Sequence, residues 1–418
     1  MMHLRKGVAV FSFVMVALIL AASFTIPSKA ETFSNPQRFR IRSTVTIVNI
    51  NSTMDRFQVY LPVPREWASQ RNVSIERIEP TPTMISTDPV YGNGIAYFLL
   101  TNVPKHSSWN FTVQYTFTFY ETHIQVDPAK VGEYNISDPE YAKYTRHRPA
   151  DDVESDDPII QNAAKDIVGA ETNPYLKAKR IYEWIAANIE YQYPSPWSAK
   201  EAYLRRSGDC GKYTALFCAM CISQGIPARP VAGIVFSPPY PGTCSNRGGF
   251  SNPPGYGGHV YAEFYLPGYG WIPADASYGH GSGDPERYLG NTWNPFVINS
   301  KGYGIEMIPS AGEKYTVSLF QHYAWWFWGE DASYDSYYTY TVEEIAASKT
   351  AVEKSSASSV ISSRTVFGTT STSSNVASST NTLVWKIGYA IGILMVLGAF
   401  ATPIIVLVFV IRRLRRKK

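Results

Sequence analysis

The segment Ser207–Val231 constrains the fold more strongly than any other part of the chain. It reads SGDCGKYTALFCAMCISQGIPARPV. Its first residues favour a loop, no proline interrupts residues 211–224, and Gly225 is a typical helix end. The segment therefore predicts an apolar helix that begins at Cys210. Unpaired backbone N–H groups at such an N-terminus stabilise an anion, so a thiolate is favoured at this position.

Two downstream stretches are predicted to form a β-hairpin. GGHVYAEFY carries His259 and GWIPADASY carries Asp275, with the turn PGYG between them. Both residues lie about eight positions from Pro267, so antiparallel pairing brings them together. A histidine activates a thiol, and a carboxylate holds the imidazole in one tautomer. The sequence thus predicts Cys210 as nucleophile, His259 as base and Asp275 as the residue that orients the base.

Each of these residues has a simpler interpretation when it is taken alone. A lone cysteine is often an inert buried side chain, a lone histidine is often structural, and an aspartate often caps a helix. The combination of the GDCG loop with the hairpin favours the catalytic interpretation.

The remaining cysteines are interpreted as structural. Cys218 and Cys221 fall in the middle of the predicted helix, whereas a redox pair starts its helix and a structural zinc site needs further ligands. We expect both to pack in the core, and we expect no cofactor and no metal. A disulfide between Cys244 and one of the others is left open, because an exported chain permits disulfides.

Both ends of the chain carry targeting signals. Residues 1–30 combine a basic start, an apolar stretch and a small-x-small site, which predicts a signal peptide, although an uncleaved anchor remains an alternative. Residues 383–411 are long and apolar enough to span a membrane, and the basic residues 412–418 follow. The positive-inside rule places this tail in the cytoplasm and the bulk of the chain outside the cell.

The charge excludes one class of partner. The chain has a formal net charge of +4, but nine positive charges lie in residues 1–30 and 412–418. Removing them leaves −5 for residues 31–411, so we expect no nucleic-acid partner.

The rest of the chain divides by its pattern. Residues 39–126 alternate apolar and polar positions as strands do, residues 127–157 are polar and acidic, and helical periodicity follows. Four N-x-Ser/Thr sequons at Asn51, Asn72, Asn110 and Asn135 suit a glycosylated exported surface. The aromatic run at 323–328 is interpreted as core or edge packing, and residues 334–340 as either a strand or a substrate surface.

Residues 158–280 resemble the transglutaminase-like (papain-like fold) superfamily, in particular its microbial and archaeal membrane-anchored members. The resemblance rests on KAKRIYEWIAANIEY, on GDCGKYTALFCAMCISQGIPARPVAGI and on GGHVYAEFYLPGYGWIPADAS. It implies the order Cys210, His259, Asp275 for nucleophile, base and orienting residue. The family commonly has tryptophan where Tyr261 stands here, and the side chain that supports an oxyanion is open between Tyr191 and Trp197.

The resemblance implies an α+β fold, with the cysteine helix packed on an antiparallel sheet. A small β-sandwich is expected before this core and a transmembrane helix after it. The expected divisions are a signal peptide at 1–30, a β-sandwich at 31–126, a connector at 127–157, a catalytic domain at 158–345, a Ser/Thr-rich stalk at 346–382, a transmembrane helix at 383–411 and a basic tail at 412–418.

The expected function is cysteine-dependent acyl transfer on protein or peptide amides outside the cell, through a thioester. Water as acceptor gives peptidase or amidase action, and an amine gives cross-linking. A cell-surface protein or peptide is the expected substrate, because the stalk limits the reach of the enzyme. The alternative is a surface binding or scaffold protein that keeps the fold without turnover.

Overall fold

The computed structural model describes residues 31–147, 153–246, 257–307, 314–329 and 333–346. The predicted signal peptide, transmembrane helix and basic tail lie outside these residues, as does the predicted stalk except for its first residue. Within the described ranges, no helix is both long and apolar enough to cross a membrane.

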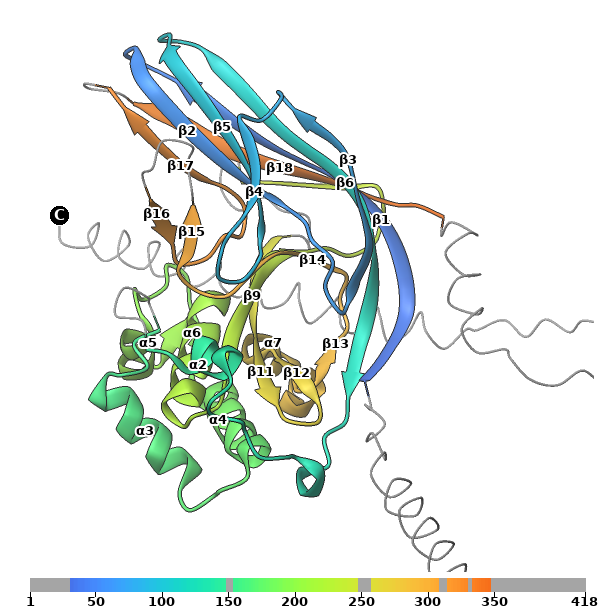
Figure 1. Ribbon diagram of the computed structural model, residues 1–418, viewed down its shortest axis with the longest axis vertical. Helices are drawn as coiled ribbons and strands as arrows, with labels where there is room; N and C mark the ends of the chain where they lie inside the picture. The colour runs from blue at the N-terminus through green and yellow to red at the C-terminus, as the bar shows by residue number, and fades with distance from the viewer. Residues whose placement is uncertain (1–30, 148–152, 247–256, 308–313, 330–332, 347–418) are drawn as a thin grey trace, which may run out of the picture.

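A β-sandwich forms the upper part of the molecule in Figure 1. Its larger sheet has the strand order β10-β18-β1-β6-β13, and β3 also pairs with β6. Its smaller sheet has the order β17-β2-β5-β4. The strands of the sandwich are β1 (Glu31–Asn49), β2 (Met54–Val63), β3 (Gln70–Glu79), β4 (Met84–Thr87), β5 (Gly94–Val103), β6 (Ser108–Ile124), β10 (Gly242–Ser245), β13 (Asn291–Thr292), β17 (Ala324–Trp328) and β18 (Tyr334–Glu344).

The sandwich corrects the expected division of the chain. Residues 324–344 were assigned to the catalytic domain, but β18 pairs with β1 from Phe39↔Glu344 to Asn49↔Tyr334, and β17 pairs with β2. The sandwich expected at 31–126 is therefore completed by strands from the far end of the chain. The physical reason is edge protection, since each added strand satisfies backbone groups that would otherwise be exposed along β1 and β2.

A second sheet has the order β12-β11-β9-β14 and lies below the sandwich in Figure 1. Its strands are β9 (Ala228–Val235), β11 (Gly257–Leu266), β12 (Gly270–Ala274) and β14 (Phe296–Lys301). All eight residues of β9 are buried. One face of this sheet joins the helical core, while Val231, Ile234 and Phe296 join the core of the sandwich. The sheet is therefore a middle layer that has apolar contacts on both faces.

Helices cover the other face of the middle sheet (Figure 1). Asp157 caps α3 and Asn173 caps α4, and each of these polar caps is followed by a proline that suits the first helical turn. The helices are η1 (Pro128–Lys130), α2 (Pro139–Thr145), α3 (Pro158–Val168), α4 (Pro174–Asn188), α5 (Ala199–Arg205), α6 (Cys210–Ser223), α7 (Ala276–Ser282) and η2 (Pro285–Tyr288).

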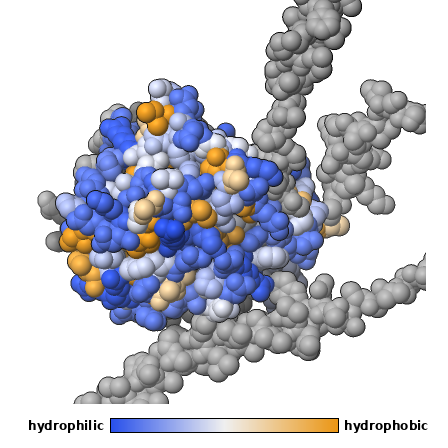
Figure 2. Space-filling model, turned by 90° about the horizontal axis from the view of Figure 1, so that it is seen from below, coloured by the Kyte–Doolittle hydropathy of each residue, from blue (hydrophilic) through white to orange (hydrophobic). Residues whose placement is uncertain are grey.

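Two short ladders complete the fold. They pair β7 (Glu190–Tyr191) with β8 (Ser207–Gly208), and β15 (Ile305–Met307) with β16 (Tyr315–Val317). The first ladder is parallel and lies just before α6, so it ties the end of α4 to the loop that precedes Cys210. On the face that Figure 2 shows, hydrophobic residues are scattered in small groups among hydrophilic ones, as is usual for a surface in contact with water.

Candidate active site

Cys210 is the first residue of α6, as the sequence predicts. Asp209 caps the helix: its side chain accepts a hydrogen bond from the backbone N–H of Lys212 at 3.1 Å. The ten residues from Tyr213 to Ile222 are all buried, so the helix is anchored in the core along most of its length. The thiol of Cys210 remains partly exposed at the helix N-terminus. A rigid helix thus presents one accessible sulfur to solvent, beside unpaired backbone N–H groups.

The hairpin of β11 and β12 brings His259 and Asp275 together. Nε2 of His259 lies 2.6 Å from Oδ2 of Asp275, and both side chains are buried. The second oxygen of Asp275 caps α7, because Oδ1 accepts hydrogen bonds from the backbone N–H of Tyr278 and the hydroxyl of Ser277. The carboxylate is therefore fixed by three partners, and Nδ1 is the ring nitrogen of His259 left for the thiol.

The protonation of His259 reflects both of its neighbours. Burial lowers the pKa of His259, but the charge of Asp275, its hydrogen bond and the side chain of Cys210 outweigh burial and raise the pKa to about 10. The side chain of Cys210 is therefore close enough to the imidazole to favour its charged form. The raised pKa favours a protonated imidazole at this position.

Two aromatic rings fix the plane of the imidazole. Tyr278 stacks on His259 with ring centroids 4.4 Å apart and an interplanar angle of 18°. Phe296 meets the imidazole edge-on with centroids 6.3 Å apart. Since the ring is held on its face and at its edge, His259 keeps one orientation towards Cys210 and Asp275. The sequence pattern predicts neither aromatic contact. Phe296 comes from β14, which is distant in the sequence from His259.

Tyr191 is the upstream aromatic residue that contacts Cys210. The side chain and the backbone of Cys210 both influence the pKa of the Tyr191 hydroxyl, so the two residues lie close together. Burial raises the pKa of Tyr191, and the neighbouring Cys210 and Asp209 charges raise it further, so the phenol stays protonated. Trp197 is 84% exposed, and its backbone N–H donates to Glu201. The choice that the sequence left open is thus decided by position: Tyr191 lies at the sulfur.

Residues 161–276 match the family model described as the transglutaminase-like superfamily. These residues form a transglutaminase-like domain within the chain. The match contains Cys210, His259 and Asp275 and ends one residue after Asp275. The transglutaminase-like domain therefore coincides with the helices and the hairpin that carry the candidate site.

Three known proteins are similar to this chain. An uncharacterized protein of Haemophilus influenzae is 31% identical over 166 residues, which cover 36% of this chain and 42% of that protein. A solved structure of a candidate cysteine protease from Cytophaga hutchinsonii is 20% identical, with a TM-score of 0.50 over 76% of this chain and 94% of that chain. The periplasmic domain of TgpA from Pseudomonas aeruginosa is 14% identical, with a TM-score of 0.31 over 61% of this chain and 91% of that chain.

Gln321 is a site residue that the sequence analysis missed. It comes from the segment between β16 and β17, outside the transglutaminase-like domain, and its side-chain amide donates to the carbonyls of His259 at 3.0 Å and Gly233 at 3.2 Å. A Cβ atom at Gly258 would lie 2.8 Å from this amide nitrogen, so glycine is needed there for the approach. No periodicity or spacing links residues 62 positions apart, so only the fold shows this contact.

The other three cysteines are buried and form no disulfide. Cys218 and Cys221 are fully buried among the helical core residues, as expected, and burial raises the pKa of each thiol. Cys244 lies on β10 in the sandwich core, and burial raises its pKa to about 12. Within the described residues, no group of three or more His, Cys, Asp or Glu side chains could hold a metal ion.

Tyr261 occupies the position where the family commonly has tryptophan. It is buried against Phe296, with ring centroids 5.4 Å apart. The tyrosine therefore packs between the middle sheet and the sandwich, and this departure from the family pattern changes packing and not the set of reacting groups.

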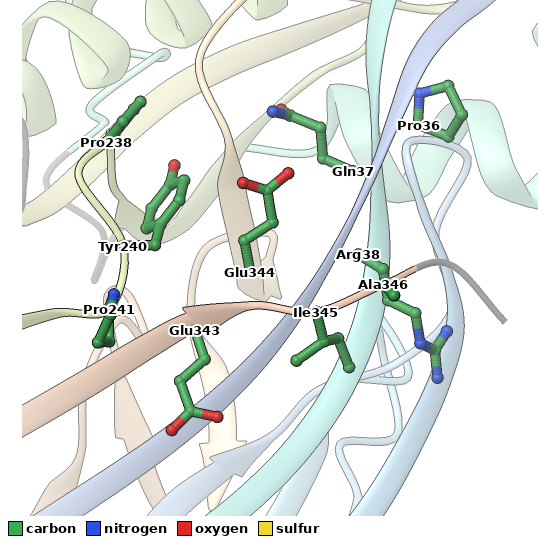
Figure 3. A pocket seen from close by; sticks show the side chains of 10 residues that line it. All are labelled: Pro36, Gln37, Arg38, Pro238, Tyr240, Pro241, Glu343, Glu344, Ile345 and Ala346. Carbon is green, nitrogen blue, oxygen red and sulfur yellow. The ribbon is translucent and has the colours of Figure 1, made fainter.

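One large hollow lies away from the transglutaminase-like site. A pocket of about 750 Å³ lies at the outer edge of the sandwich, where β1, the 238–241 segment and the end of β18 meet (Figure 3). Its lining contains no cysteine and no histidine. A much smaller hollow of about 30 Å³ touches His259 and Asp275. The chemistry of the side chains, and not the size of the hollow, marks the candidate active site.

Proposed function

We propose that this chain is a cysteine-dependent acyl-transfer enzyme that acts on the amide bonds of proteins or peptides. Cys210 serves as nucleophile, His259 as acid and base, and Asp275 as the group that orients and charges the imidazole. The observation that carries the proposal is the 2.6 Å contact between His259 and Asp275, on an imidazole whose pKa is also raised by the neighbouring side chain of Cys210. The transglutaminase-like family and the cysteine-protease description of the neighbour from Cytophaga hutchinsonii support the same reaction class.

The first half of the reaction forms a thioester. The thiolate of Cys210 attacks the carbonyl carbon of the substrate amide, and the C–S bond forms while the carbonyl oxygen takes up negative charge. The backbone N–H of Cys210 and the hydroxyl of Tyr191 are donors for that oxygen. The C–N bond then breaks, and His259 gives its Nδ1 proton to the leaving nitrogen.

The second half returns the enzyme to its starting state. Neutral His259 accepts a proton from water or from an amine, which attacks the thioester carbon. The C–S bond breaks and the thiolate re-forms beside the imidazolium. Water yields a carboxylic acid, and an amine yields a new amide. Hydrolysis is the proposed default because water is the more abundant acceptor.

The place of action is part of the proposal. The terminal apolar runs and the basic tail support a chain anchored by one membrane helix, with the catalytic part outside the cell and the C-terminus in the cytoplasm. A substrate at the cell surface follows from such a tether.

Thiol labelling tests the reaction class directly. The native chain is treated with iodoacetamide across a range of pH, and the modified cysteine is located by peptide mass mapping. We expect selective labelling of Cys210 near neutral pH, faster than that of a free thiol and slowed in His259→Ala. Cys210→Ser should lose the label, while Cys244→Ser serves as the matched control and should keep it.

Incubation of the full chain with peptide and amine probes, followed by mass analysis, then tests turnover. A product that depends on Cys210 assigns hydrolysis or transamidation. Labelling of Cys210 at the rate of a free thiol, without turnover, would favour a binding or scaffold protein instead.

A further inference from the structure

A second hollow lies between the middle sheet and the sandwich, on the face of the sheet opposite to α6. Its volume is about 460 Å³. Residues alternate along β11: Ala262, Phe264 and Leu266 belong to the helical core, whereas Glu263 and Tyr265 line this cavity. Cys210 is not among its lining residues, so the cavity is separate from the open side of the candidate nucleophile.

A buried cluster of three charged side chains forms part of the lining. Glu263 accepts hydrogen bonds from the ammonium of Lys301 at 2.7 and 2.9 Å, and from two nitrogens of Arg229 at 2.9 and 2.7 Å. None of the three residues is more than 8% exposed. Two cations therefore face one carboxylate, which leaves one positive charge in a buried place. An unbalanced buried charge is costly, and a bound anion would neutralise it.

The cluster also has more hydrogen-bond donors than acceptors. An arginine has five N–H donors, and Arg229 uses two on Glu263 and one on the hydroxyl of Tyr144. Lys301 has three donors and uses two on Glu263. The buried indole N–H of Trp67, which also lines the cavity, has no partner among the described residues. Donors therefore remain while both oxygens of Glu263 are engaged, and the missing partner is an acceptor.

The walls of the cavity are largely aromatic. The guanidinium of Arg229 stacks on Trp271 at 3.7 Å from the ring centroid, and the ammonium of Lys301 lies 5.0 Å from the centroid of Trp67. Tyr265 packs edge-on against Trp271. A site with a cationic floor and aromatic walls suits a ligand with one acidic group and an apolar body. A small inorganic anion would neutralise the charge but would make no contacts with the aromatic walls.

We propose that this cavity is a binding site for a small organic carboxylate. The carboxylate pairs with Lys301 and Arg229 and accepts the indole N–H of Trp67, while the apolar part of the ligand lies against Trp271 and Tyr265. The site is independent of the proposed chemistry at Cys210, and it stands if that chemistry fails.

Calorimetric titration of the purified full-length chain tests the site, with benzoate as the probe and benzamide as its neutral counterpart. We expect saturable binding of benzoate and binding of benzamide that is weaker by about tenfold or more, because only benzoate supplies a charged acceptor. Absence of saturable benzoate binding, or equal binding of the two compounds, overturns the proposal. So does displacement of benzoate by an equal concentration of sulfate, which would assign an inorganic anion site.

Two substitutions separate binding from folding. Trp67→Phe removes an N–H that has no partner, so the fold should be unaffected while benzoate affinity falls by about threefold to tenfold. Trp197→Phe, at an exposed tryptophan, is the matched control and should bind as the wild type does.

Glu263→Gln raises the net charge of the cluster and should strengthen benzoate binding, an effect opposite to that of a damaged pocket. Unchanged affinity in Trp67→Phe overturns the proposal even if Glu263→Gln does not fold.

Discussion

Nε2 of His259, on β11, lies 2.6 Å from Oδ2 of Asp275, which directly follows the paired strand β12. Asp275 also begins α7, where its other oxygen caps the helix. The carboxylate of Asp275 thus lies between β12 and α7, where it caps the helix and contacts the imidazole. The orientation of His259 is therefore set by the same backbone that closes the hairpin, and the charge of Asp275 controls the proton on the ring.

Asp275→Asn should lower the upper pH limit of Cys210 reactivity. Asparagine keeps the size and the helix cap but removes the charge that raises the pKa of His259 to about 10. We expect the upper limb of the plot of iodoacetamide alkylation rate against pH to move to lower pH. Amide turnover should fall by about 10²-fold or more. Asp138→Asn, at the exposed cap of α2, is the control. An unshifted upper limb in Asp275→Asn would contradict the role given to the carboxylate.

The stability of the chain should also depend on His259. Its pKa is raised in the folded state, from an ordinary value of 6.5 to about 10. A raised pKa contributes stability that is fully present below about pH 6.5 and is lost as the pH rises through about 10. Melting temperatures measured from pH 6 to pH 10 should therefore fall more steeply for the wild type than for His259→Gln. Parallel curves would show that the imidazolium contributes nothing to folding.

Tyr191→Phe should reduce turnover more than substrate binding. The hydroxyl of Tyr191 lies near Cys210, where the carbonyl oxygen of a bound substrate would develop charge. We expect kcat to fall by about tenfold or more with little change in KM, since the donor acts mainly in the transition state. Tyr203→Phe, on α5 against Trp184, is the control. Equal losses in both variants would point to a general disturbance of this region.

Gln321→Ala should make the backbone of His259 less firmly held without changing any of the reacting groups. The variant leaves the carbonyls of His259 and Gly233 without the amide that links them to the sandwich. We expect a loss of about 1–2 kcal/mol in the free energy of unfolding. We also expect a lower kcat, while KM should stay near its wild-type value. Gln161→Ala, on the exposed face of α3, should change neither quantity. A stability loss with unchanged kcat would make Gln321 a structural residue only.

Removal of β17 and β18 should abolish folding. A chain that ends at Val317 lacks a strand that pairs with β1 at eleven positions, together with the edge strand beside β2. We expect aggregation or protease sensitivity, because buried residues of the sandwich such as Val45 and Phe57 would lose their cover. A chain that ends at Ala346 keeps both strands and should give a cooperative unfolding transition. Soluble, cooperatively folded protein from the shorter chain would show that the sandwich is complete without them.

Local pattern was sufficient for the elements that carry the candidate site. Helical periodicity after residue 157 predicted helices in the region of α3 and α4, and the loop before Cys210 predicted the start of α6. The turn after Leu266 was enough to predict that His259 and Asp275 meet, because a hairpin fixes which positions lie opposite each other. These features depend on residues close in sequence, where helix caps and turns act.

Contacts between distant segments needed the folded chain. The alternating pattern of residues 334–344 predicts a strand, but it does not identify β1 as the strand with which these residues pair. The same holds for Gln321 at His259, for Phe296 beside the imidazole and for Lys301 at Glu263. The sequence alone determined the family, the order of the candidate catalytic residues and the helix that presents the thiol. Only the tertiary structure decided what surrounds them, because burial and pairing arise when segments far apart in the chain share one core.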